Sequence, residues 1–202
     1  MNPSTTLALG AASTRAPAVP TETASGDDTT DCAQVKRIAL TFDDGPAATY
    51  TAELLKDLAP YKARVTFFTV GQNVAAHPEL VRAEAKAGHE VGNHSWSHPD
   101  LTRLTTAQVQ QQLERTSAAI KAATSKAPTT LSPVLWDVDT EDWKYRDAAK
   151  VARTVIDKAS RNDVVLMHDI HATSVAAVPE ILKTLTARGY PFVTVSHLRA
   201  TL

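Results

Sequence analysis

The chain has 202 residues, a hydrophobic content of 43% and a formal net charge of −1 at pH 7. This length fits one domain with a sizeable core, and so small a net charge excludes the strongly basic surface of a typical nucleic-acid-binding protein. No apolar run reaches the roughly 20 residues that a transmembrane helix requires. Cys32 is the only cysteine, which rules out an internal disulfide and a cysteine-based zinc site. We expect a monomer with no nucleic-acid partner and no membrane span.

Residues 1–34 are expected to form a disordered leader or linker, because they are rich in Thr, Ala and Pro and show no helical or strand period. The weakly apolar stretch Thr5–Ala12 has no basic residue before it and is short for a signal peptide. Since Ala/Thr/Pro linkers are common in exported wall-active proteins, we expect an extracellular or cell-wall-associated protein. The folded domain is expected to span residues 35–202.

From residue 35 onward the hydrophobic pattern alternates between strands and helices. Strands are expected at Val35–Phe42, Arg64–Val70, His89–Asn93, Val134–Val138, Asp163–Met167 and Phe192–Val195. Helices are expected at Thr51–Leu58, from Pro78 to just before Gly88, from a capping box at Thr105 and Gln108 to Ala123, at Asp147–Ala159 and at Val175–Arg188. Repeated β-α units predict an α/β fold with parallel strands and outer helices, as an open sheet or a barrel.

Two adjacent carboxylates, Asp43 and Asp44, stand where the first strand runs into the turn Gly45-Pro46. This end of a strand is where α/β folds place their functional groups. Neighbouring side chains on an extended backbone point in different directions, so one aspartate can bind a metal while the other handles a proton. The alternative is that Asp-Asp-Gly is a turn sequence without chemistry.

A second group of polar residues, which includes His94 and His98, follows the strand that ends at Asn93. On a helical turn, two histidines four residues apart face the same way and can share one metal ion. Because they also follow a strand end, we expect them on the same rim as the two aspartates. Imidazoles with a carboxylate are a normal ligand set for zinc. Ordinary structural histidines and a purely structural metal site are the alternatives.

His168 ends another apolar strand, so it should lie on that rim and could act as a proton donor with a tunable pKa. The alternative is a histidine that only satisfies local hydrogen bonds. Between Trp136 and Trp143 lies a cluster of carboxylates, Asp137, Asp139, Glu141 and Asp142. A carboxylate beside a catalytic histidine can orient it and raise its basicity, and an indole can form a wall that faces a sugar, although it is as often plain packing.

In combination and order, four motifs resemble those of the polysaccharide deacetylases with a NodB homology domain, carbohydrate esterase family 4. They are Thr41-Phe-Asp-Asp-Gly45, His94-Ser-Trp-Ser-His98, Asp139-Thr-Glu-Asp142-Trp143 and Leu166-Met-His168. The resemblance extends from about Val35 to Leu198. It implies a NodB-type distorted (β/α) barrel, which has seven units in the family, with the site at the strand C-termini.

The resemblance also implies a role for each matching residue. It implies one divalent metal ion, usually zinc, held by Asp44, His94 and His98. It implies further that Asp43 is the catalytic base, that His168 is the catalytic acid, and that Asp142 tunes this histidine. By the same resemblance, Trp143 and Leu166 form walls of the acetyl pocket.

One motif of the family is missing. Relatives carry an Arg-x-Pro segment, a helix and a further strand between the helix that ends near Ala123 and the strand at Val134. Here too few residues intervene, because a β/α unit needs roughly 30 residues with its crossover. We therefore expect an internal deletion, six strands, and a barrel one β/α unit short of seven that either closes tighter or exposes two unpaired edges.

In the family the missing arginine orients the catalytic aspartate, so we expect impaired catalysis unless another basic residue replaces it. The candidates for that replacement are Arg103, Lys144 and Arg146. Three functions remain open. The first is removal of acetyl groups from N-acetylglucosamine units of an acetylated polysaccharide, peptidoglycan or chitin-like. The second is an acetylxylan-type O-deacetylase that uses the same site. The third is a glycan- or metal-binding remnant without catalysis.

Overall fold

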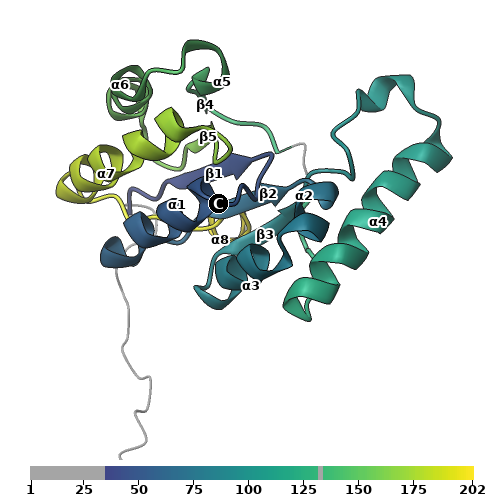
Figure 1. Ribbon diagram of the computed structural model, residues 1–202. Coiled ribbons are helices and arrows are strands. Elements are labelled where there is room, and N and C mark those ends of the chain that lie inside the picture. Colours follow the sequence, from purple (N-terminus) through teal and green to yellow (C-terminus); the bar gives the residue numbers. More distant parts are fainter. Residues whose placement is uncertain (1–34, 132–133) are drawn as a thin grey trace, which may run out of the picture. The chain divides into compact units, whose positions relative to one another are not determined.

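The computed structural model describes residues 35–131 and 134–202, so the predicted leader at 1–34 lies outside the described residues. Five strands form one sheet in the order β3-β2-β1-β5-β4, and every pairing is parallel. The strands are β1 (Ala39–Asp43), β2 (Thr66–Thr69), β3 (Glu90–Asn93), β4 (Val138–Asp139) and β5 (Val164–His168). This confirms the predicted α/β fold with a parallel sheet (Figure 1).

The predicted helices are also found, and the capping box at Thr105 and Gln108 is present. The α-helices are α1 (Tyr50–Leu58), α2 (Gly71–Ala76), α3 (Pro78–Lys86), α4 (Thr106–Thr124), α5 (Asp142–Tyr145), α6 (Ala148–Lys158), α7 (Ala172–Ala187) and α8 (Val195–Ala200). Two 3-10 turns lie at Ala59–Tyr61 and Leu101–Arg103. The short helices α2, α5 and α8 were not predicted. Within the described residues, no helix has the length and apolarity to cross a membrane.

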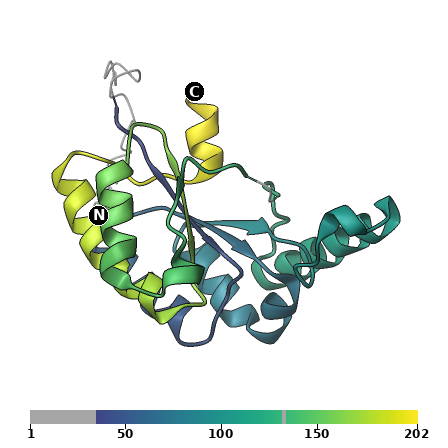
Figure 2. The ribbon, with the colours of Figure 1, turned by 90° about the horizontal axis from the view of Figure 1, so that it is seen from above.

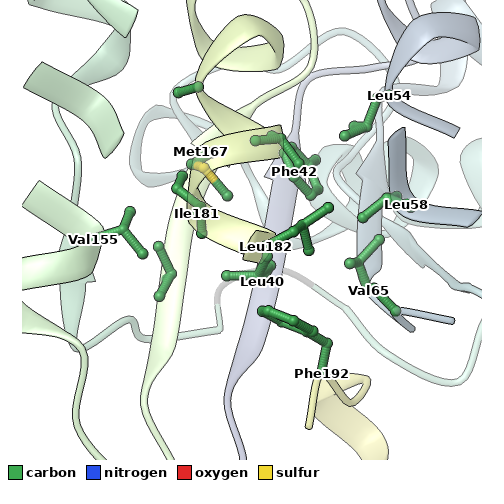
Figure 3. Packing of buried hydrophobic residues seen from close by; sticks show 14 of the residues in the cluster. Leu40, Phe42, Leu54, Leu58, Val65, Val155, Met167, Ile181, Leu182 and Phe192 are labelled. Carbon is green, nitrogen blue, oxygen red and sulfur yellow. The ribbon is translucent and has the colours of Figure 1, made fainter. Parts of the chain in front are cut away.

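Alternation along the strands sorts the core into two faces. Leu40 and Phe42 of β1 belong to the larger cluster, which α1, α6 and α7 cover with Leu54, Val155 and Ile181 (Figure 3). The opposite face is smaller, and α8 covers it. There Ala39, Phe68 and Val164 pack against Val195 and Leu198. Both ribbon views place α8 on the side of the sheet away from α1 (Figures 1 and 2).

The predicted last strand, Phe192–Val195, is wrong. Phe192 forms only an isolated parallel bridge with Ile38. The chain then turns into α8, because the Thr194 side chain accepts a hydrogen bond from the His197 N–H and so caps a helix that begins at Val195. β-Branched residues therefore predicted a strand where a capping threonine starts a helix.

The predicted strand at Val134–Val138 is shortened to β4. Only Val138 and Asp139 pair with β5, while the side chains of Leu135 and Trp136 are exposed. On the other side of the sheet, Leu131 makes a single parallel bridge with Asn93. In the described part of the chain no further strand joins β3 to β4, so both are edges of the sheet. Two edges are one of the two outcomes that we expected from the loss of a β/α unit.

We expect the Leu182→Ala variant to lower the free energy of unfolding by about 2–5 kcal/mol, because Leu182 of α7 is fully buried in the larger cluster and its removal leaves a cavity. Denaturant unfolding followed by circular dichroism measures this change. Leu135→Ala is the matched control, since the Leu135 side chain is 82% exposed. Equal stability of the two variants would contradict the assigned core.

Candidate active site

The pairing of the strands brings the predicted site residues to one rim of the sheet. Asp43 is the register partner of His168 on β5, and Thr69 is the partner of Asn93, which directly precedes His94. Asp43 shares its face of the sheet with Ala39, and so lies on the side opposite Leu40 and Phe42. The predicted convergence of the carboxylates and the histidines on one rim is therefore confirmed.

Asp44, His94 and His98 form a cluster in which the nearest ligand atoms all lie within 4.8 Å of one another. The Asp44 Oδ1 atom lies 3.3 Å from His94 Nε2 and 3.7 Å from His98 Nε2. Asp44 has a positive φ of 70°, which turns its side chain out of the strand toward the histidines. Asp43 is close as well, with its Oδ2 atom 3.7 Å from His94 Nε2.

The histidines meet in a way that the sequence spacing did not predict. They do not lie on a helical turn, because residues 94–98 form an irregular loop after β3. Ser95 and His98 adopt left-handed backbone conformations, with φ of 66° and 51°. The loop nevertheless brings the two imidazole rings to a centroid separation of 4.7 Å. The expected pairing of the histidines is thus correct and its helical explanation is wrong.

The donor atoms of the cluster fit a divalent cation. Asp44 Oδ1 is buried and has no well-aligned hydrogen bond, although His94 lies close to it, and Asp43 Oδ1 is also buried without a partner. Buried carboxylate oxygens need a partner. A tetrahedral zinc ion with bonds of about 2.1 Å places its ligand atoms roughly 3.4 Å apart, close to the separations found here. Two imidazoles and one carboxylate leave a coordination position open.

The two aspartates differ in their electrostatics. Burial raises the pKa of Asp43 to about 6, despite the opposing effects of His94 and His168. Burial would also raise the pKa of Asp44, but the hydrogen-bonding and charge effects of His94, together with His98 and His168, outweigh it and hold the pKa below its ordinary value. Asp44 is therefore suited to be a permanent anion, whereas Asp43 can exchange a proton near neutral pH.

On β5, His168 is held by the predicted partner Asp142. His168 Nδ1 and Asp142 Oδ1 are 2.8 Å apart, and the backbone N–H of His168 donates to Asp142 Oδ2 at 2.8 Å. Burial favours the neutral imidazole, but Asp142 outweighs it, so the pKa of His168 is raised above its ordinary value. Burial likewise opposes the charge on Asp142, yet the hydrogen bonds from His168 and Ser174 lower the pKa of this carboxyl. The carboxylate thus accepts from Nδ1–H and leaves Nε2 for other partners.

The two predicted pocket residues also lie beside His168. Leu166 is two residues earlier on the same strand, so its side chain shares the face of His168. Trp143 follows Asp142, donates its N–H to the Asp142 carboxylate at 2.9 Å and leaves its side chain 52% exposed. Leu166 is thus a buried neighbour of His168 on β5, and Trp143 is an exposed neighbour of Asp142 in the chain, while their role as pocket walls stays a prediction.

Sequence reasoning missed two residues around the site, Ser174 and Asp169. The Ser174 hydroxyl donates to Asp142 Oδ2 at 2.5 Å from α7, six residues beyond His168, and no motif marked it. Asp169 is fully buried, accepts a hydrogen bond from the Thr51 hydroxyl, and has its pKa raised by burial to about 7. A Cβ atom at Gly45 would overlap its carboxylate. The position of Asp169 directly after His168 in the sequence was the signal that could have identified it.

None of the three basic residues considered as replacements for the missing arginine contacts Asp43. Arg103 pairs with Asp100 at 3.1 Å, and Lys144 pairs with Glu141 at 3.0 Å. Arg146 donates from Nε to the carbonyl of Trp143 at 2.8 Å. The charged groups with the largest effects on Asp43 are two histidines and two other carboxyls, which leaves burial to set its raised pKa.

An α/β sheet with carboxylates and histidines on one rim has the groups that acid–base hydrolysis requires, and comparison of the sequence with protein families identifies the family. The profile of the family described as polysaccharide deacetylase matches residues 30–150. The chain belongs to this family, which confirms the resemblance inferred from the four motifs.

Similar proteins include the peptidoglycan-N-acetylglucosamine deacetylase PgdA of Listeria monocytogenes, which is 42% identical over 180 residues and matches 81% of this chain and 39% of its own length. The solved structure of the peptidoglycan deacetylase PdaC from Bacillus subtilis is 40% identical, with a TM-score of 0.81 over 83% of this chain and 92% of that one. The solved structure of the Xyl-CE4 domain of a multidomain xylanase, from the hindgut metagenome of Trinervitermes trinervoides, is 29% identical. Its TM-score is 0.77, and the match covers 82% of this chain and 90% of that one. The chain thus spans well under half of the Listeria protein.

We expect Asp142→Asn to lower the pKa of His168, because the imidazolium loses the negative partner that opposes the effect of burial. The measurement is an NMR titration of the histidine rings in metal-free protein, with the His168 signal assigned by its loss in His168→Gln. Asp139→Asn is the matched control, since the Asp139 carboxylate accepts from the Glu141 N–H and does not touch His168. An unchanged titration of His168 in Asp142→Asn would refute the pairing.

Proposed function

We propose that this protein is a metal-dependent hydrolase that removes acetyl groups from N-acetylglucosamine units of a polysaccharide, with peptidoglycan as the favoured substrate. One observation carries the proposal. Asp44, His94 and His98 can hold one cation, while Asp43 on β1 and His168 on β5 are neighbours in register beside it. A base, an acid and a metal site within one cluster are the parts that hydrolysis of an amide requires.

Asp43 is the proposed general base. With a pKa of about 6 it is ionised above that pH and can accept a proton from the attacking water. Its side chain is 11% exposed, so little bulk water competes for it. The Oδ1 atom is buried and has no hydrogen-bond partner within the described residues, so no hydrogen bond reduces its basicity.

His168 is the proposed general acid. Asp142 orients the ring through Nδ1, so the Nε2–H of the protonated imidazole can donate to the departing sugar nitrogen. The raised pKa of His168 keeps more of the ring protonated near neutral pH. Protonation matters because an amine is a poor leaving group until it carries a proton. Trp143 and Leu166 would border the acetyl group on this side.

Zinc is the cation that the donor set favours, since two imidazoles and a carboxylate are typical of catalytic zinc sites. When bound, such an ion polarises a carbonyl and lowers the pKa of a coordinated water. The protein's own contribution is to hold Asp44, His94 and His98 in place and to keep the base and the acid beside them.

The printed names of the relatives support peptidoglycan, because PgdA is described as a peptidoglycan-N-acetylglucosamine deacetylase and PdaC as a peptidoglycan deacetylase. This substrate would place the protein outside the cell or in its wall.

An acetylxylan-type activity is the second candidate, supported by the similar domain of a xylanase. Acetate release from acetylated xylan, compared with release from N-acetylglucosamine oligomers, distinguishes the two substrates.

Catalysis is proposed to be slower than in relatives that retain the Arg-x-Pro segment. Asp43 has no arginine or lysine among the groups with the largest effects on its pKa, and the two histidines that favour its charged form do not outweigh the effect of burial. The loss of one oxyanion donor by itself commonly costs on the order of a hundredfold in rate. Turnover equal to that of a relative that carries the Arg-x-Pro segment would contradict this impairment. Metal uptake without acetate release would favour the non-catalytic alternative.

Acetate release from an N-acetylglucosamine oligomer in the presence of zinc tests the proposal. We expect Asp43→Asn to reduce the rate by about 10²–10⁴-fold, because the amide cannot accept the proton. Removal of the metal with a chelator should abolish the activity, and added zinc should restore it. Asp157→Asn on α6 is the matched control, since Asp157 is exposed and outside the site. Full activity of the Asp43→Asn variant would overturn the assigned base.

A further inference from the structure

The loop of residues 94–98, here called the histidine loop, holds its two histidines in different ways. His94 follows β3 directly, and its N–H donates to the carbonyl of Thr69 at 3.0 Å, so the sheet fixes it. His98 lies at the far end of the loop, and its side chain is 59% exposed against 12% for His94. The sheet cannot fix His98, so its position depends on whatever holds the intervening residues.

The left-handed residues make this support necessary. Ser95 and His98 both have positive φ without being glycine, a conformation that costs free energy for residues with a Cβ atom. A loop with two such residues keeps its shape only when the surrounding structure imposes it.

The residues between the histidines are hydrogen-bonded on two sides. On one side, the carbonyls of Ser95 and Trp96 accept the N–H groups of Gly71 and Gln72, both at 3.0 Å, at the start of α2. On the other side, the N–H groups of Trp96 and Ser97 both donate to one atom, Oε1 of Gln112 on α4, at 2.8 and 2.9 Å. The Nε2 group of Gln112 also donates to the Ser97 hydroxyl at 3.2 Å.

The Trp96 side chain strengthens this attachment to α4. The guanidinium of Arg115 lies 3.6 Å from the centroid of the indole. The indole also packs so closely on Gly71 that a Cβ atom there would overlap it. The packing fixes where the loop lies on α4, and Gln112 fixes the direction of the peptide groups that lead to His98.

We propose that Gln112 is a positioning residue of the metal site, which sets the distance of His98 from His94 and Asp44 through the two N–H groups it accepts. The proposal rests on the proposed function, because it takes Asp44, His94 and His98 as the ligands of one cation. Gln112 touches none of them. Its effect should appear first in metal affinity, since a displaced ligand weakens binding even where the fold is intact.

The zinc affinity of the full chain, measured by competition with a chromophoric chelator, tests the proposal. Gln112→Met keeps the length and helix propensity of the side chain but has no acceptor for the N–H groups. We expect it to bind zinc about 10–100-fold more weakly. Gln112→Glu supplies a carboxylate oxygen in place of the amide oxygen for both N–H groups and should keep the affinity of the unaltered chain. Gln111→Met is the matched control, because Gln111 is the exposed neighbour on the same helix.

A second measurement separates positioning from a general loss of structure. At saturating zinc, we expect acetate release by Gln112→Met to recover most of the rate lost at limiting zinc, while helix content by circular dichroism stays unchanged. Should Gln112→Met misfold, Gln112→Ala gives the same comparison. The His98→Ala variant should lose zinc binding, which shows that the measured binding is at this site. If that holds and Gln112→Met binds zinc as tightly as Gln111→Met, the role of Gln112 is overturned while the proposed function stands. An unaltered chain that binds no zinc overturns the proposed function as well.

Discussion

The parallel pairing of β1 with β5 is the constraint on which the site depends. Five register pairs run from Ala39 with Val164 to Asp43 with His168, and all but the last residue of β5 are buried. Because side chains alternate, a slip of one residue would turn Asp43 or His168 to the other face and separate the base from the acid. The same alternation buries Leu40, Phe42 and Met167 under α1, α6 and α7. The register that packs the core is therefore the same register that aligns the site.

The metal cluster depends on a less regular element. The histidine loop carries two left-handed residues, and its peptide groups are held by α2 on one side and α4 on the other. Thus helices far from the reacting atoms take part in the site. The arrangement also explains why α4 carries little of the main core and yet packs against α2 and α3 through a cluster of its own. In both ribbon views α4 lies at the opposite end of the sheet from α6 (Figures 1 and 2).

The shortened connection between Leu131 and Val138 affects both architecture and electrostatics. It leaves β3 and β4 as edges among the described residues, with exposed apolar side chains at Leu131, Leu135 and Trp136. The connection is also where we expect the family's arginine segment to be missing. Burial raises the pKa of Asp43 to about 6, and the groups with the largest charge effects on it are two histidines and two carboxyls, whereas a guanidinium partner would lower this pKa.

The sequence by itself determined the alternation of the main strands and helices and the strand ends that carry Asp43, Asp44 and His168. These features follow from local periodicity and capping, which can be recognised in each segment by itself.

The tertiary structure decided what local patterns cannot encode. Thr194 caps helix α8, which begins in a β-branched stretch that predicted a strand. His94 and His98 meet through an irregular loop and not through a helical turn. Ser174 on α7 donates a hydrogen bond to Asp142 on α5. Gln112 stands in a polar run that looks like solvent-exposed helix, and its contact with the loop exists only because α4 packs back against it. Such contacts join residues distant in sequence, so only the packing of the whole chain selects them.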